Sequence, residues 1–466
     1  MATHIVWFKN DLRLADNPAL HVACASGAKV ALLYILDERA GAASRWWLYY
    51  SLAALRQDIA ARGGTLILRR GDPVSIIPAL AKTLGADEVH TARSIEPYWR
   101  QADKTLDTAL KTQSVRLLRH HSVSLFPPEA IRTKAGGAYG VFTPFSKACF
   151  EAGVPDLLLP APARLHGADA PSEALEDWDL LPAKPDWAGG LRAEWKPGEA
   201  GAAVRLHDFC ANAINSYGQA RDYPGRPGTS KLSPHIHFGE ISPRTVWLRA
   251  AALPASAGVQ TYLKELLWRE FSLHLLWQHP DIRTRPIREE FRAFPWAADA
   301  PALRAWQRGQ TGIPIVDAGM RELWQTGWMH NRVRMIVASY LVKHLLIPWR
   351  QGEAWFWDCL CEADEAANGA SWQWVAGCGA DAAPYFRIFN PVLQGQKFDT
   401  DGAYVRRFVP ELARLTDKYI HAPWEADAAT LARAGIHLGQ TYPAPLVELA
   451  AGRARALEAY AKVKAM

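Results

Sequence analysis

The order of apolar runs in the first 125 residues constrains the fold more than any other feature of the sequence. Short apolar runs alternate with segments of helical periodicity, a pattern typical of a parallel sheet with helices on both faces. The strand-like runs are residues 4–8, 29–36, 65–70, 88–93 and 115–121. The helical segments between them lie near residues 44–62, 74–85 and 98–112. We therefore predict a doubly wound parallel-sheet α/β domain at the amino terminus.

From about residue 200 onward helical periodicity dominates, which predicts an all-helical second domain. The stretch before it is rich in Pro, Ala and Gly, the composition of a connector that runs over the surface. The predicted boundaries are 1–128 for the α/β domain, 129–200 for the linker and 201–466 for the helical domain. No GxGxxG follows the first strand, so a dinucleotide bound by the usual Rossmann device is not expected there. A crevice at the carboxyl ends of the strands is expected instead, for a second small ligand.

Composition narrows the class of protein further. No apolar run approaches membrane-spanning length and the amino terminus lacks a signal-peptide pattern, so we expect a cytoplasmic protein, by default a monomer. The six cysteines form no CxxC pair and are expected to be core thiols, with no metal site and no disulfide. A net charge of +6 permits nucleic-acid binding without requiring it. Twenty tryptophans suggest ring stacking or electron hopping in addition to core filling.

The segment from Glu362 to Asn390 combines acids, small residues, one amide and two tryptophans. Such a mixture makes a poor amphipathic helix but a good wall for a flat polar ligand with an aromatic ring. The alternative is a buried helix end that carries two core tryptophans. The polar and aromatic candidates in the segment are Glu362, Asp364, Asn368, Trp372 and Trp374.

Three shorter motifs also carry chemistry. GTSKLSP, residues 228–234, places hydroxyl groups and a lysine on a turn that enters a helix, which is either a pyrophosphate cradle or a plain helix cap. Glu265, Trp268 and Arg269 share one helical face, as do Asn331, Arg334 and Met335. A surface salt bridge beside a packed tryptophan is the alternative for the first face. His330 on its own is more typical of a structural residue.

Several long motifs in order resemble the photolyase and cryptochrome family of blue-light-absorbing flavoproteins, and in particular its bacterial enzymes that repair cyclobutane pyrimidine dimers. The resemblance runs through nearly the whole chain. It is carried by IVWFKNDLRLADNPAL (5–20), GTSKLSPHIHFGEISPR (228–244), LLWREF (266–271), GIPIVDAGMRELWQTGWMHNRVRM (312–335) and WQWVAG with DAAPYFRIFNP (372–391).

The resemblance implies FAD in the helical domain and an antenna pigment in the α/β domain. We expect methenyltetrahydrofolate stacked on an aromatic as the antenna, with 8-hydroxy-deazaflavin as the alternative. Residues that match the family's FAD site are Tyr217, Thr229, Ser230, Lys231, Leu232, Ser233, Arg269, Arg334, Glu362, Asp364 and Asn368. Trp372, Trp349 and Trp296 match its chain of three tryptophans from flavin to surface.

The resemblance also implies UV-damaged DNA as the partner and a pocket for a flipped dimer. The expected catalytic residues are Glu265, Asn331, Met335, Trp268 and Trp374, with Glu265 hydrogen-bonded to the damaged pyrimidine and the two tryptophans forming an aromatic wedge. Arg221, Arg332 and Arg387 are expected to neutralise DNA phosphates. The run at residues 283–292 could add to them or be a solvated face of mixed charge.

Three other functions compete with repair. A cryptochrome that senses blue light shares the fold, FAD and tryptophan chain, but the complete dimer pocket, the lack of a carboxyl-terminal tail and Asn368, where plant cryptochromes carry Asp, favour repair. A six-four photolyase would need active-site histidines, and a dark flavin oxidoreductase would need a nicotinamide site. The resemblance implies that Arg334 pairs with Glu362, as a matching Arg–Asp pair does in relatives. Glu362 thus stands where relatives have Asp, and Gly369 where many have a second Asn.

Overall fold

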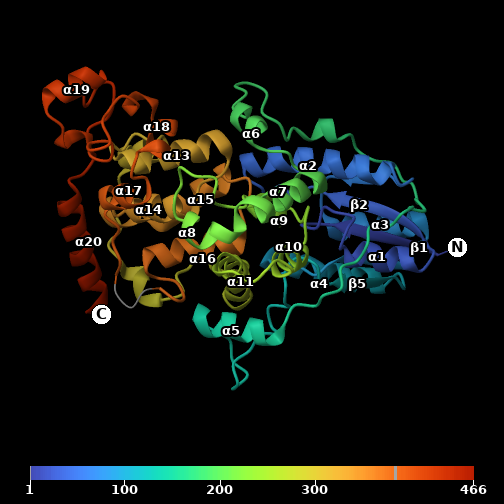
Figure 1. Cartoon of the computed structure of the whole chain (residues 1–466). Coiled ribbons are helices and arrows are strands. Elements are labelled where there is room, and N and C mark those ends of the chain that lie inside the picture. Colours follow the sequence, from blue (N-terminus) through green and yellow to red (C-terminus); the bar gives the residue numbers. More distant parts are fainter. Residues whose placement is uncertain (1, 383–385, 466) are drawn as a thin grey trace.

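Five parallel strands form a sheet at one end of the molecule, and helices make up the other end (Figure 1). The computed structural model describes residues 2–382 and 386–465. The strands are β1 Thr3–Phe8, β2 Lys29–Ile35, β3 Leu66–Arg69, β4 Glu88–Ala92 and β5 Arg116–His120, in the order β3-β2-β1-β4-β5. The strand order reverses between β1 and β4, so a crevice is expected at their carboxyl ends.

Alternation along the strands explains how both faces of the sheet are covered. Val6 and Phe8 of β1 face a core shared with α1 and α2, whereas Ile5 and Trp7 face one shared with α3 and α4. The helices are α1 Pro18–Ala25, α2 Ala42–Ala60, α3 Pro73–Leu84 and α4 Pro97–Lys111. The predicted doubly wound domain is thus confirmed.

The predicted connector contains structure that its composition did not reveal. It holds α5 Phe142–Ala152, η1 Leu175–Trp178 and α6 Gly189–Glu194. Helix α5 packs against α11 and contributes Phe142, Phe145 and Cys149 to a core of the helical domain. Residues 142–152 therefore depart from the expected surface connector.

The second domain is helical, as predicted. Its first helices are α7 Glu199–Asn212, η2 Ile214–Ser216, α8 Tyr217–Ala220, α9 Ser233–His237, α10 Pro243–Ala251, α11 Ala257–Gln278, η3 Glu289–Ala293, α12 Ala300–Gln307 and α13 Pro314–Thr326. The remainder are α14 Asn331–Ser339, the π-helix η4 Tyr340–His344, α15 Trp349–Cys359, α16 Glu365–Ala376, α17 Pro391–Phe398, α18 Ala403–Phe408, η5 Pro410–Leu412, η6 Pro423–Glu425, α19 Ala428–Ala434 and α20 Leu449–Lys464.

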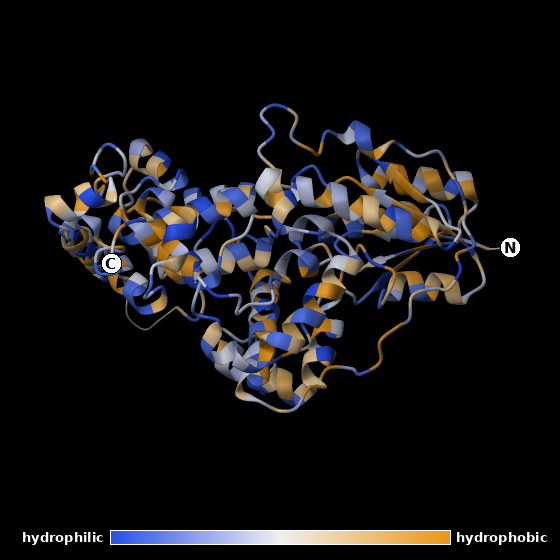
Figure 2. Cartoon of the chain, turned by 45° about the horizontal axis from the view of Figure 1, so that its top comes forward, coloured by the Kyte–Doolittle hydropathy of each residue, from blue (hydrophilic) through white to orange (hydrophobic). Residues whose placement is uncertain are grey.

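Two separate hydrophobic cores build this domain, and α16 belongs to both. Ala366 packs in the core around α11, whereas Trp372 and Ala376 pack in the core around α13, α14 and α15. Hydrophobic and hydrophilic residues alternate along most of its helices (Figure 2), as expected for helices with one buried face. Within residues 2–382 and 386–465, no helix combines the length and the apolar character needed to cross a membrane.

The two domains meet through backbone contacts that leave no room for side chains. A Cβ atom at Gly41 would overlap the main chain of Trp357, and one at Gly239 would overlap that of Asn10. Beside the second contact, the buried guanidinium of Arg13 donates hydrogen bonds to the carbonyl oxygens of Gly239 and Ser122, at 3.0 and 3.1 Å. The motif at residues 5–20 therefore fastens the sheet to the helical domain.

Candidate active site

The predicted site residues gather where α16 contacts both α11 and α14. Helix α11 carries Glu265, Trp268 and Arg269, and the first turns of α14 carry Asn331 and Met335. The turn at residues 228–232 enters α9 nearby, because Ser233 at the start of α9 donates a hydrogen bond to Glu362 at 3.3 Å. Three elements distant in sequence thus converge, as the motifs predicted.

The turn before α9 is shaped by its backbone. A Cβ atom at Gly228 would lie 2.7 Å from the carbonyl oxygen of Ala220, so the chain can pass there only as glycine. Lys231 has a left-handed backbone, with φ of 50°, and its ammonium lies 2.7 Å from Glu194. The predicted cradle residues Thr229, Ser230, Lys231, Leu232 and Ser233 therefore sit on one tight turn with three hydroxyl groups.

Tyr217 is linked to this turn through a second tyrosine. Its buried ring meets Tyr262 edge to face, with centroids 5.3 Å apart, and the Tyr262 hydroxyl donates to Ser230 Oγ at 3.3 Å. The aromatic pair and the hydroxyl-rich turn consequently form one continuous wall.

Arg334 and Glu362 form the expected ion pair, which confirms that part of the sequence analysis. Arg334 also donates through Nε to the carbonyl oxygen of Met329 at 2.7 Å. The other carboxylate oxygen of Glu362 is buried and has no hydrogen-bond partner among the described residues. A buried acceptor without a donor is costly, so this position suits a ligand that supplies one. Together with the hydroxyl-rich turn, it fits the polar groups of FAD.

Asn368 is held in one orientation by Glu353. The Asn368 amide donates to the carbonyl and carboxylate oxygens of Glu353, at 3.2 and 2.9 Å. Arg283 in turn donates to the same carboxylate at 2.7 Å. This fixes the amide nitrogen and leaves its oxygen as the acceptor for a neighbouring group. At Gly369, a Cβ atom would lie 3.1 Å from Ile282, which explains why a small residue fits here.

The dimer-pocket candidates on α11 have partners that the sequence did not reveal. Glu265 forms an ion pair with Arg221, and each side chain is only partly exposed. Trp268 stacks on Phe142 of α5, with ring centroids 3.6 Å apart and planes within 8°. Arg221 therefore orients Glu265, and its role toward DNA phosphates stays a prediction.

Asp381 joins Trp374, one of the predicted wedge tryptophans, to Phe142, the residue that stacks on the other. Its carboxylate accepts from the backbone N–H of Phe142 at 3.2 Å, and its carbonyl oxygen accepts from the Trp374 indole at 3.1 Å. Its backbone is left-handed, with φ of 50°, which is uncommon for a residue with a side chain. Asp381 thus ties the start of α5 to α16. Pro384 and Tyr385 of the same motif lie outside the described residues.

Asn331 and Met335 stand one helical turn apart on α14, exposed and half-buried, so a substrate can reach them. Arg332 pairs with Asp222 at 2.7 Å. His330 caps α14 by accepting from the backbone N–H of Arg332 at 3.2 Å, and burial lowers its pKa to about 4. Its buried Nε2 has no hydrogen-bond partner among the described residues, so a purely structural role stays a prediction.

Most charges of the run at residues 283–292 are paired at the surface, whereas Arg283 pairs with the buried Glu353. Arg285, Arg288 and Arg292 each lie within 3.2 Å of a nearby carboxylate. The solvated-face interpretation of this run agrees with these pairs.

The three tryptophans of the predicted chain share one core and become more exposed along it. Trp372 and Trp349 are 2% and 4% exposed, and Trp296 is partly buried at the edge of the same core. The rings that contact Trp372 are Phe356 and Trp306, with centroids at 5.0 and 6.2 Å. This increase in exposure suits an electron path from the core to the surface. The order in which an electron passes between the three tryptophans stays a prediction.

Arg269 and Asp364, which match the family's FAD site, line a hollow between the domains, and their contact with FAD stays a prediction. This hollow lies at the carboxyl ends of β1 and β4 and is also lined by Asn10, Glu96 and Trp99; its space of about 470 Å³ includes open solvent. Arg269 donates to the carbonyl oxygen of Val123 at 2.9 Å, toward the α/β domain. The predicted crevice at the strand ends is therefore present, between the domains.

The pKa values of two carboxyl groups around this crevice are shifted in opposite directions. Burial, followed by the charge of Glu365, raises the pKa of Glu96 to about 8. Burial opposes the charged form of Asp364 as well, but the nearby His237, whose Nδ1 lies 3.8 Å from the carboxylate, lowers its pKa below the ordinary value. The crevice thus places a carboxyl group whose pKa is raised close to one whose pKa is lowered.

Comparison with known proteins agrees with this geometry. The family models "DNA photolyase" and "FAD binding domain of DNA photolyase" match residues 4–163 and 262–462. A deoxyribodipyrimidine photo-lyase of Agrobacterium fabrum is 49% identical over 99% of this chain and 98% of its own length. Cryptochrome-1 of Arabidopsis thaliana is 35% identical over 98% of this chain and 70% of its own.

The fold gives the same result. The crystal structure of a bacterial class III photolyase from Agrobacterium tumefaciens superposes with a TM-score of 0.98 and 48% identity, over 100% of this chain and 98% of that one. The chain has an FAD-binding domain of the photolyase type. It belongs to the DNA photolyase family.

Proposed function

We propose that the protein repairs cyclobutane pyrimidine dimers in DNA with light, as a deoxyribodipyrimidine photo-lyase. The observation that carries the proposal is the partly exposed pair of Glu265 and Trp268 on α11, with Asn331 and Met335 accessible on α14. Helix α16, which bears Asn368 and Trp374, contacts both helices. A carboxylate, an amide and flat rings around one place suit a damaged base flipped out of the duplex.

The residues of the chain bind and orient both partners. The hydroxyl-rich turn, Tyr217 and the Arg334–Glu362 pair would hold FAD. When bound and reduced, FAD supplies the light-driven electron that opens the cyclobutane ring. Glu265, oriented by Arg221, hydrogen-bonds the damaged pyrimidine, and Trp268 and Trp374 hold its apolar surface. Arg332 and Arg387 neutralise phosphates at the mouth of the site.

The test is repair of an oligonucleotide with one cis-syn thymine dimer, under blue light and in darkness. We expect thymine to be restored only in the light, and Glu265→Gln to lower the rate about tenfold or more, because a hydrogen bond to a charged group contributes about 1.5–3 kcal/mol. Glu176→Gln, the same change at an exposed site in η1, should repair normally. A reduced, FAD-loaded protein that restores no thymine would contradict the proposal, and the blue-light receptor would replace it.

We further propose that the crevice at the strand ends binds an antenna pigment. The Glu96 carboxyl group, whose pKa burial raises to about 8, and the ring of Trp99 suit a pterin, which favours methenyltetrahydrofolate over 8-hydroxy-deazaflavin. Reconstitution with each pigment, followed by flavin-sensitised repair at the pigment's own absorption band, distinguishes the two. Pigment binding unchanged by Glu96→Ala would place the antenna elsewhere.

We also propose that the protein acts as a monomer in the cytoplasm. All six cysteines are free, four of them buried, which suits a reducing compartment. Light scattering of the FAD-loaded protein tests the monomer.

A further inference from the structure

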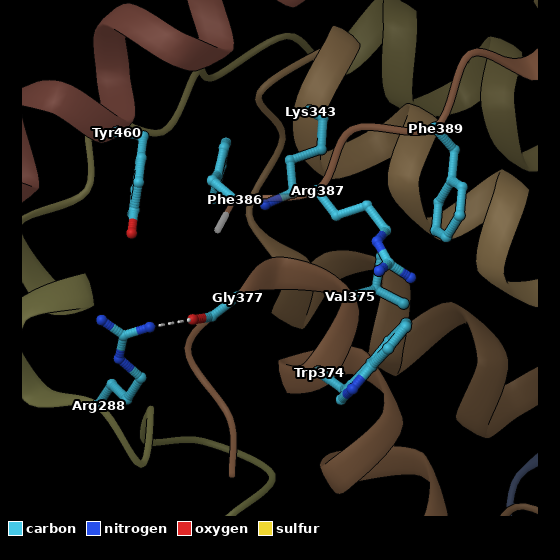
Figure 3. A pocket seen from close by; sticks show the side chains of 9 residues that line it. All are labelled: Arg288, Lys343, Trp374, Val375, Gly377, Phe386, Arg387, Phe389 and Tyr460. Carbon is cyan, nitrogen blue, oxygen red and sulfur yellow. Dashed lines mark hydrogen bonds between the residues drawn. The ribbon is translucent and has the colours of Figure 1, made fainter. Parts of the chain in front are cut away.

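Two clusters of nitrogen-bearing side chains have no role in the proposed repair reaction, and they differ in what their polar atoms contact. At the carboxyl end of α16 (Figure 3), Lys343 is 1% exposed, donates to the carbonyl oxygen of Ala376 at 2.8 Å and lies over the ring of Phe386. Arg288 donates there to the carbonyl oxygen of Gly377 at 3.2 Å. These contacts stabilise the end of α16. The second cluster lies on the sheet, and its ring nitrogens point toward a carboxylate.

Three side chains that can bind a metal share one face of the sheet: His4 of β1, and Glu88 and His90 of β4. Glu88 and His90 point to the same face because they are two residues apart on a strand, and His4 lies opposite Glu88 in the pairing of β1 with β4. Nε2 of His4 lies 3.8 Å from Glu88 Oε2, and Nε2 of His90 lies 2.9 Å from the same oxygen. The three side chains therefore converge on one place.

The spacing of these atoms suits a zinc ion. Zn²⁺ binds imidazole nitrogen and carboxylate oxygen at about 2.0–2.2 Å, so two ligands of a tetrahedral site lie about 3.3–3.6 Å apart. The two distances to Glu88 Oε2, 2.9 and 3.8 Å, lie on either side of this range. Two histidines and one glutamate form a ligand set that zinc uses when water takes the fourth position. The Glu88 side chain is 12% exposed, so water can reach that position.

Ser26 holds the His4 ring in the tautomer that a metal needs. The Ser26 hydroxyl, at the end of α1, donates its single hydrogen to the carbonyl oxygen of Ala23 at 2.9 Å. In the contact between Ser26 Oγ and His4 Nδ1, at 3.4 Å, the ring must therefore be the donor. A neutral imidazole with its hydrogen on Nδ1 has a lone pair on Nε2. This lone pair faces the Glu88 carboxylate, and a cation between the two acceptors would stabilise both.

His120 of β5 provides the same kind of support for His90. The two rings stack with their planes within 15°, and His90 Nδ1 lies 3.1 Å from His120 Nε2. When His90 donates from Nδ1 to His120, its Nε2 presents a lone pair toward Glu88, as His4 does. A metal-bound histidine commonly donates its other ring N–H to a neighbouring acceptor, which fixes the ring and its tautomer. Both histidines of this cluster have such a partner.

Arg116 orients the carboxylate between the two histidines. It forms an ion pair with the other oxygen of Glu88, Oε1, which leaves Oε2 facing the rings. The Arg116 side chain is 71% exposed, so solvent screens much of its charge from the cluster. Glu88 is thus placed to give a metal one oxygen ligand.

We infer that His4, Glu88 and His90 bind a zinc ion, and that Ser26 and His120 position the two histidine rings. Bound zinc joins β1 to β4 near their amino ends, whereas the proposed antenna crevice lies at their carboxyl ends. No cysteine takes part. His4 and Glu88 are far apart in the sequence, so only the pairing of β1 with β4 reveals the site.

The experiment titrates zinc chloride into the full-length, FAD-loaded protein, which carries no histidine tag and has been dialysed against a chelator. A chromophoric chelator competes for the zinc and reports the affinity. We expect one zinc ion per chain, which an excess of Mg²⁺ does not displace because Mg²⁺ prefers oxygen ligands. His120→Phe should weaken zinc binding about 10- to 100-fold, the usual effect of losing a partner that supports a ligand, and His4→Gln should weaken it further. The control is His207→Gln, the same change at an exposed histidine of α7, and it should bind zinc like the wild type.

X-ray absorption of the wild-type zinc complex identifies the ligands without any variant, so the test holds even if His4→Gln does not fold. We expect nitrogen and oxygen neighbours at about 2.0–2.2 Å and the scattering pattern of imidazole rings. A sulfur neighbour at about 2.3 Å would assign the zinc to cysteine thiolates and overturn the inference.

The titration can overturn the inference in two further ways. The zinc site is refuted if the wild type binds no stoichiometric zinc, or if His4→Gln binds it as tightly as the wild type. Wild-type affinity in His120→Phe would refute the positioning role of His120. None of these measurements involves repair, so their outcome is independent of the proposed function.

Discussion

Phe142 offers a direct test of how the fold prepares the dimer site, because it stacks on Trp268 from a segment that the sequence marked as a connector. Changing Phe142 to Leu keeps a buried apolar side chain but removes the parallel ring at 3.6 Å. Stacked aromatic pairs contribute about 0.5–1.5 kcal/mol beyond the area they bury. If that energy orients Trp268 for the damaged base, the variant should bind a dimer-containing oligonucleotide about 2- to 12-fold more weakly.

The matched control is Phe145→Leu. Phe145 lies in the same helix and is also buried, but its ring contacts Tyr139, Phe271 and His274 rather than Trp268. Both variants should melt at lower temperature, whereas only Phe142→Leu should lose affinity in dark anisotropy titrations. Equal affinities for the two variants would refute the reasoning. Tighter binding by Phe142→Leu would also refute it, because Phe142 would then compete with the substrate for the indole face.

Three other expectations test the remaining parts of the site. Glu362→Gln should weaken FAD binding about 10- to 150-fold, since it removes a charge-assisted contact of about 1.5–3 kcal/mol. Flavin fluorescence on dilution measures the release of FAD. Full retention of FAD would exclude the Arg334–Glu362 pair from the cofactor site. Trp349→Phe should slow the photoreduction of oxidised flavin, whereas the chemically reduced variant should repair dimers normally. Unchanged photoreduction would place the electron path elsewhere, for example through Trp306. Burial raises the pKa of Glu322 to about 7, so the contribution of Glu322 to folding stability is present below its unfolded pKa and is lost as the pH rises through 7. The melting temperature should therefore fall less between pH 6 and pH 8 in Glu322→Gln than in the wild type. Parallel curves of melting temperature against pH would contradict this.

Local sequence patterns predicted the positions of the strands well, but they did not predict which elements pack against each other. The five strands lie within one or two residues of the predicted runs, because alternating apolar runs of this length fit a buried parallel sheet. Helix α5 was missed because the Pro- and Gly-rich sequence around it is typical of loops, and only tertiary packing on α11 shows its role.

In the candidate site too, the sequence indicated residues better than the contacts between them. The Arg334–Glu362 pair was expected from the family resemblance. The Arg221–Glu265 pair joins residues 44 positions apart on different helices, and nothing in either motif indicates it. Asp381 was missed for a further reason: its role depends on a left-handed backbone and on two contacts to other elements, and neither leaves a local signal.

The glycine contacts between the domains have a consequence for light collection. Excitation passes between two pigments with a rate that depends steeply on their separation and on the angle between their transition dipoles. Domains joined by an ordinary polar interface move relative to each other and would blur both quantities. Here main chain meets main chain at Gly41 and Gly239, so we expect the strand-end crevice to keep a fixed position relative to the helical domain. A pigment in that crevice would keep a constant optical coupling to the flavin, and enlarging either glycine would detune it without touching a ligand contact.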